Sequence, residues 1–184
     1  MREQESTAAA EPHSPLDVAA LYAQHAVFVG RIIKRLASPG PHVEDLLQET
    51  FIVAFKQRAS FQGRSSVETW LYGIAENLCW RYRRGLSRFN VFHGRMSSHD
   101  DHEQPRLPSD ELEKKEAIAA VQRALAKLSF KQREVFVLYE LEGREGDEIA
   151  SMIGIPAGTV WTRLHQARKS FKKVMERERA RGQL

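Results

Sequence analysis

Helical periodicity runs through almost the whole chain and is broken once, over a long stretch in the middle. No segment alternates apolar and polar residues with the period of two that a half-buried strand shows, and glycines and prolines cluster between helical patterns. From Gly85 to Ser109 the helical pattern fails, and this polar stretch contains Pro105 and Pro108. We therefore predict an all-α chain of two small helical domains joined by a flexible linker.

Stop signals divide each half into helices and set the expected boundaries. Ser129, with Gln132 three residues on, predicts a capping box, and Gly154 occupies a position that favours a left-handed residue after a helix. The helices expected cover about 15–37, 43–60, 67–84, 110–128, 129–143, 145–153 and 156–179. We place a disordered tail at 1–14, the first domain at 15–89, the linker at 90–109 and the second domain at 110–184.

Composition narrows the class of protein. Hydrophobic residues make up 42% of the 184 residues, but no run of about 18 apolar residues exists, so we expect no membrane insertion. Residues 1–15 lack the apolar stretch of a signal peptide. The single cysteine, Cys79, cannot form an internal disulfide or a cysteine-rich metal site. We predict a protein of the cytoplasm, with no cofactor and no metal.

Charge is distributed in blocks along the chain. Residues 81–95 carry five arginines and no acid, residues 97–116 carry seven acids, and residues 163–181 carry eight basic residues against two acids. Two basic blocks separated by an acidic strip indicate two contacts with a polyanion, although solvated helix faces give the same pattern.

The segment from Glu148 to Val160 has the pattern of a helix-turn-helix. Ala150 is small where two helices would cross, Gly154 makes the turn, and apolar residues fill the space between the helices. On the last helix one side is apolar and the other polar, so its first turns are expected to reach base edges and its later cations to reach phosphates. A plain helical hairpin is the alternative. The residues we assign to DNA here are Gly158, Thr159, Trp161, Thr162, Arg163, His165, Arg168, Lys169 and Lys172.

The helix expected from residue 43 carries an acidic stripe opposite its core side. Asp45, Gln48, Glu49 and Ile52 follow one another at spacings of three, one and three. An acidic stripe that holds an exposed isoleucine is typical of a docking surface for a basic protein partner. A solvated face with one stray apolar residue is the alternative.

Aromatic residues alternate with arginines in and before the third helix. A Gly-Ser loop precedes them, and this combination suits the capture of unstacked bases, although most of these aromatic residues, Trp70 above all, could belong to the core. We expect Trp80 and Tyr82 to be exposed. The residues assigned to DNA in this half are Phe61, Arg64, Asn77, Trp80, Arg81, Tyr82, Arg83 and Arg84.

Four segments together resemble the ECF (extracytoplasmic function) sigma factors of the sigma-70 family. The match spans roughly residues 16–175, with the segments in the family's order. They are Val43–Phe51 (VEDLLQETF), Glu68–Leu78 (ETWLYGIAENL), Leu128–Phe136 (LSFKQREVF) and Gly154–Arg168 (GIPAGTVWTRLHQAR).

The resemblance implies a transcription initiation factor rather than an enzyme. The stripe of Asp45, Gln48 and Glu49 would dock on the β′ clamp helices of core RNA polymerase, whose β subunit is a further partner. The first domain would melt and read the −10 element of promoter DNA, and the helix-turn-helix would read the −35 element. The acidic linker would run toward the RNA exit channel. The resemblance further implies release from an anti-sigma factor by a signal.

The chain departs from the family pattern at four positions. Gly73 and Glu76 stand where the family usually has basic residues, Trp161 where it has lysine and Glu145 where it has a serine cap. Trp161 therefore indicates either a distinct −35 preference or a surface that an inhibitor buries.

Two other functions fit part of the pattern. A free-standing helix-turn-helix regulator explains the second half but leaves the acidic stripe and the aromatic-arginine helix without a role. A metal-dependent nuclease or hydrolase would use residues in and beside the linker, which lack a supporting shell. Those residues are His93, His99, Asp100, Asp101 and His102.

Overall fold

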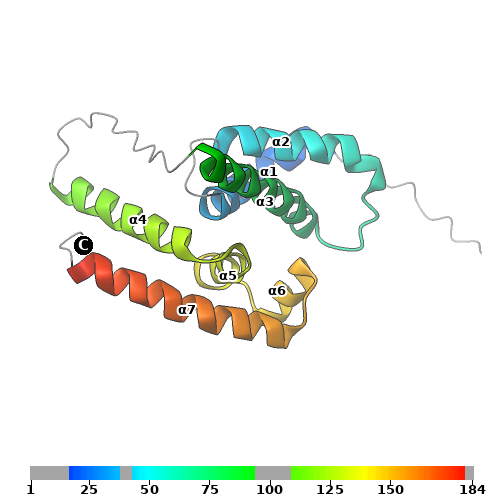
Figure 1. Ribbon diagram of the computed structural model, residues 1–184. Helices are drawn as coiled ribbons and strands as arrows, with labels where there is room; N and C mark the ends of the chain where they lie inside the picture. Colours follow the sequence, from blue (N-terminus) through cyan, green and yellow to red (C-terminus); the bar gives the residue numbers. More distant parts are fainter. Residues whose placement is uncertain (1–16, 38–42, 94–108, 181–184) are drawn as a thin grey trace, which may run out of the picture.

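The computed structural model describes residues 17–37, 43–93 and 109–180 and confirms the all-α prediction, with no strand in these ranges (Figure 1). The predicted tail at 1–14 and most of the predicted linker, including His99 and His102, lie outside the described residues.

Three helices that contact one another pairwise form the first half. They are α1 (Val18–Leu36), α2 (Val43–Gln57) and α3 (Val67–His93), with a short 3-10 turn, η1 (Arg58–Ser60), after α2. The Asp17 carboxylate accepts a hydrogen bond of 2.9 Å from the amide of Ala19, and the Ser66 hydroxyl accepts one of 3.1 Å from the amide of Thr69. These side chains satisfy amides that a helix start leaves unpaired.

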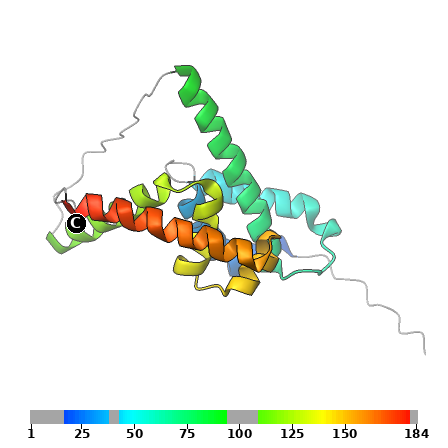
Figure 2. The same cartoon turned by 60° about the horizontal axis from the view of Figure 1, so that its bottom comes forward.

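The second half is built along one long helix. Its elements are α4 (Ser109–Lys127), α5 (Phe130–Phe136), a π-helix η2 (Val137–Leu141), α6 (Gly146–Ile153) and α7 (Ala157–Ala180). Helix α7 packs along α4 and α5, and α6 packs across its N-terminal turns (Figure 2). The capping box of Ser129 and Gln132 is confirmed, and so is the left-handed Gly154, whose φ is 68°.

Two of the helices differ from the sequence prediction. Helix α3 continues through Gly85 to His93, and its C-terminal part projects away from the other helices (Figure 2). One glycine costs a helix interior only about 1 kcal/mol, which the long N-terminal part of α3 outweighs. The predicted helix over 129–143 widens into η2, where the amide of Glu142 donates to the carbonyl of Val137 five residues back.

The two halves pack against each other instead of standing apart. Helix α5 and η2 contact α1, while α6 contacts α3. Buried side chains from both halves therefore form one connected core, from Leu21 in α1 to Ala167 in α7.

Charged groups tie the halves together at this junction. The Glu142 side chain is 4% exposed and pairs with Arg31, at 2.9 Å, and with Arg35. The fully buried Arg133 donates a 3.1 Å hydrogen bond to the carbonyl of Leu36 at the end of α1, where the helix dipole favours a cation. Arg144 pairs with Glu68 of α3.

Removing the Glu142 carboxylate is expected to destabilise the protein. The change Glu142→Ala leaves Arg31 and Arg35 without their shared partner, and we expect the free energy of unfolding to fall by about 1–3 kcal/mol. The matched change Glu176→Ala removes a carboxylate from an exposed pair with Lys172 and should cost less than about 0.5 kcal/mol. Equal losses for the two variants in urea unfolding would show that the Glu142 contacts do not hold the halves together.

Candidate protein and nucleic-acid interfaces

The acidic stripe lies on the exposed side of α2, as predicted. Asp45, Gln48 and Glu49 are exposed, and Ile52 keeps 52% of its surface accessible. The opposite side of α2 is anchored by Leu46, Thr50, Phe51 and Ala54, all of them buried. Because these contacts fix the rotation of α2, the stripe faces outward as a continuous surface.

Phe55 extends this surface, and sequence reasoning missed it. Its ring is 51% exposed and lies 3.9 Å from the guanidinium carbon of Arg58. The spacing in the sequence could have revealed it, because Phe55 follows Ile52 by three residues and so falls on the same side of the helix. Two adjacent exposed apolar side chains strengthen the case for a protein-binding surface.

The aromatic residues of the first half divide between core and surface. Trp70 packs against the core and lies 4.9 Å from the ring of Phe61, as centroids. Trp80 is 41% exposed, and the guanidinium carbon of Arg84 lies over its ring, 4.4 Å from the ring centroid. Tyr82 differs from the prediction, because it is partly buried against the core, and this burial raises the pKa of its hydroxyl.

The remaining residues assigned to DNA in this half lie in different settings. Arg64 and Arg81 are exposed, and the exposed Asn77 donates to the carbonyl of Gly73 on its own helix at 2.8 Å. Arg83 is instead half-buried, with its guanidinium 3.5 Å from the carbonyl of Leu36. The Arg83 side chain is thus directed toward the junction of the halves.

The outer side of α7 carries most of the residues assigned to the −35 element. The buried stripe of Val160, Leu164 and Ala167 fixes the rotation of α7. Thr159 is half-buried. The exposed residues are Gly158, Trp161, Thr162, His165, Arg168, Lys169 and Lys172.

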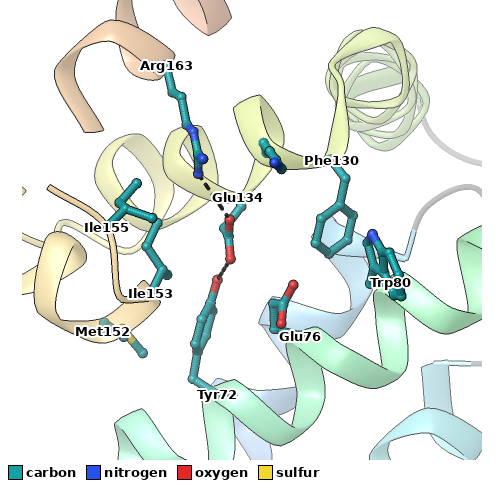
Figure 3. Close-up of a pocket in the computed structure, with 11 residues that line it drawn as sticks. Tyr72, Glu76, Trp80, Phe130, Glu134, Met152, Ile153, Ile155 and Arg163 are labelled. Atoms are coloured by element: carbon teal, nitrogen blue, oxygen red, sulfur yellow. Dashed lines mark hydrogen bonds and ion pairs between the residues drawn. The ribbon is translucent and has the colours of Figure 1, made fainter. Parts of the chain in front are cut away.

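Arg163 differs from these residues because it points into the junction of the halves. Its side chain is 20% exposed and lies 4.0 Å from the Glu134 carboxylate (Figure 3). In this conformation Arg163 cannot act together with the outer side of α7.

A cavity of about 350 Å³ lies at this junction, between α3, α5 and the α6–α7 turn (Figure 3). The Tyr72 hydroxyl donates a 3.0 Å hydrogen bond to Glu134, and Glu76, Trp80 and Phe130 line the same cavity. Burial raises the pKa of Glu134 to about 7, and nearby Glu76 adds to the effect, while Tyr72, Arg163 and Lys131 oppose it. Protonated Glu134 is therefore the form that the closed junction favours.

Neither a membrane-spanning helix nor a metal-binding cluster is found among the described residues. None of the described helices is both long and apolar enough to cross a bilayer. Within the same ranges, no group of three or more His, Cys, Asp or Glu side chains converges.

Comparison with known proteins identifies both halves. Residues 21–89 match the family model of sigma-70 region 2, and residues 118–171 match that of sigma-70 region 4. The RNA polymerase sigma factor YlaC of Bacillus subtilis is 34% identical over 140 residues, which cover 74% of this chain and 79% of YlaC. The ECF RNA polymerase sigma-E factor of Escherichia coli K12 is 31% identical over 150 residues, covering 75% of this chain and 76% of that protein.

A solved structure has the same fold. The sigma factor RpoE of Bartonella quintana, in complex with the anti-sigma factor NepR, superposes with a TM-score of 0.67 at 22% identity. The superposition covers 86% of this chain and 96% of the other.

The ionisation of Glu134 makes stability depend on pH. The pKa of Glu134 lies near 7 in the folded protein, and its ordinary value is 4.5. The stabilisation that the protonated carboxyl gives to the folded state is therefore complete below pH 4.5 and is lost as the pH rises through 7. The variant Glu134→Gln stays uncharged and still accepts from Tyr72. It should match the parent at pH 4 and exceed it by about 3 kcal/mol at pH 8.

Urea unfolding at a series of pH values measures this difference, with Glu176→Gln as the exposed control. Parallel stability curves for Glu134→Gln and the parent would contradict the assignment of a raised pKa to Glu134.

Proposed function

The chain belongs to the ECF group of the sigma-70 family, and from this we propose that it binds core RNA polymerase, directs it to particular promoters and helps to melt the −10 element. It acts as an initiation factor rather than an enzyme, and its work with polymerase places it in the cytoplasm. One observation carries this proposal. Each of the two matched sigma-70 regions contains one of the exposed surfaces, region 2 the surface on α2 and region 4 the surface on α7.

Docking is assigned to the outer side of α2. Asp45, Gln48 and Glu49 supply negative charge, and Ile52 and Phe55 supply apolar area at the same place. Charged residues steer association with a basic partner, while apolar side chains supply most of the affinity. The β′ clamp helices, together with the β subunit, are the proposed partner.

Promoter reading is divided between the halves. In the first, Trp80 with Arg84 across its ring offers a stacking platform beside a cation for an unstacked base of the −10 element. In the second, the outer side of α7 faces the −35 element, with Thr162 and His165 reading bases and Lys169 and Lys172 contacting phosphates.

The closed junction has to open before both elements are read. Arg163 and Arg83 are directed into the junction, and Trp80 lines its cavity. We assign the closed conformation to the factor away from its promoter, and the open one to the complex with polymerase.

An anti-sigma factor is the proposed regulator. The Bartonella quintana sigma factor of the same fold was solved with the anti-sigma factor NepR, and exposed apolar residues such as Ile52 and Trp161 offer contacts for an inhibitor. One inhibitor that covered both halves would block docking and DNA binding together. A free-standing regulator would instead bind specific duplex DNA tightly without polymerase, and it would leave the α2 surface unused.

Reversing the charge of the docking surface is expected to abolish polymerase binding. The double change Asp45→Lys and Glu49→Lys alters two exposed residues, so the fold should persist while affinity for core polymerase and promoter-specific transcription fall at least tenfold. The matched control is Glu116→Lys with Glu176→Lys, which makes the same change of charge on exposed residues of the second half.

Co-purification with core polymerase and transcription from a promoter library measure these effects. The control should stay within about twofold of the parent. Undiminished polymerase binding by the folded Asp45/Glu49 variant would contradict the docking assignment. Tight, specific duplex binding by the chain alone would favour the regulator.

A further inference from the structure

The first residue of α6 is a glycine over which the indole of Trp161 lies. A Cβ atom built on Gly146 would stand 2.5 Å from Cζ2 of Trp161 and 3.1 and 3.2 Å from Cε2 and Cη2. Real side chains do not approach so closely, so only glycine leaves room for the ring here. The N-terminal turn of α6 thus forms one wall of the Trp161 site.

Tyr139 forms a second wall. Its ring meets the Trp161 ring edge-on, with centroids 5.5 Å apart and an interplanar angle of 72°. Tyr139 belongs to the π-helix η2, and the next residue, Glu140, accepts a 2.6 Å hydrogen bond from Arg168. The Arg168 guanidinium also lies 5.2 Å from the Tyr139 ring. Helix η2 therefore braces α7 at two positions that are two turns apart.

Trp161 remains 47% exposed although two neighbours hold its ring. It lies on the same outer side of α7 as the exposed Thr162 and His165. An aromatic side chain that is already held in place loses little conformational entropy when it makes a contact. Its accessible surface is largely apolar, and in the major groove the apolar feature of a base pair is the methyl group of thymine.

We propose that Gly146 and Tyr139 are positioning residues that hold Trp161 as a rigid apolar contact, so that the factor prefers thymine at one position of the −35 element. This inference rests on the proposed reading of the −35 element by α7. It places determinants of base preference outside α7, on two residues that do not themselves touch DNA.

A purely structural role for the same contacts predicts a different behaviour. If Trp161 only stabilises the α6–α7 turn, disturbing it should lower the stability of the protein and reduce transcription from all promoters alike. If it reads a base, the loss should be confined to one position. Because alanine favours a helix more than glycine does, and the clashing atoms belong to a side chain that can swing outward, Gly146→Ala should displace the indole and leave the chain folded.

The test is a selection of −35 sequences by polymerase holoenzyme reconstituted with each variant. For Gly146→Ala we expect the preference for thymine to fall at least fivefold at one position, the position that Trp161→Ala also affects, with the other positions unchanged. The double variant should match Trp161→Ala alone, because both changes remove the same contact. Ser151→Ala, an exposed change on the same helix α6, is the matched control and should retain the parent preferences.

Tyr139 supplies an independent arm if Gly146→Ala fails to fold. Tyr139→Ala should relax the same position, and Tyr139→Phe, which keeps the ring, should restore the preference.

Three outcomes overturn the proposal. A shift for Trp161→Ala that neither Gly146→Ala nor Tyr139→Ala reproduces would show that Trp161 reads DNA without being positioned by them. A uniform loss at every position would make the contacts structural. Unchanged preferences for both Trp161→Ala and His165→Ala would remove the reading role of α7, and the proposed function would then fail in that part as well. If His165→Ala changes the base preference at a different position, the selection detects base reading by α7 independently of Trp161.

Discussion

Buried charge at the junction of the two halves is the constraint on which the rest of the structure depends. Arg133 is fully buried, the Glu142 side chain is 4% exposed, and each is paired with a group on α1. Burial, together with the nearby Arg83, lowers the pKa of Arg133 to about 9, so the site opposes the charge that it holds. A junction that contains buried charges separates more readily than a wholly apolar one, because each charged group regains water when the halves part. Charge thus aligns the halves without fixing them permanently.

The junction also divides the functional surfaces into two sets. The stripe on α2 and the outer side of α7 lie outside it and are exposed. Arg163, Arg83 and the Tyr72–Glu134 pair lie inside it. Under the proposed docking through α2, this division sets an order of events in which docking comes first and the inner set becomes available when the halves separate.

Sequence reasoning predicted the features that depend on local pattern. The rotation of α2, the capping box at Ser129 and the turn at Gly154 each follow from residues within a few positions of one another. It missed the junction, because the pairing of Arg31 with Glu142 joins residues 111 positions apart and leaves no periodic signal. The π-helix and the Gly146–Trp161 contact were missed for a similar reason, since neither changes the helical pattern of the sequence.

The distance between the halves, free and on polymerase, tests the account most directly. Spin labels on Lys56→Cys in α2 and Lys173→Cys in α7 occupy exposed positions, while the native Cys79 is buried, with its pKa raised to about 12, and so resists labelling. An opening junction predicts one short distance distribution for the free chain and a longer one in the complex with core polymerase and promoter DNA. The same short distance in both states would contradict it, because the halves would then read a promoter without separating.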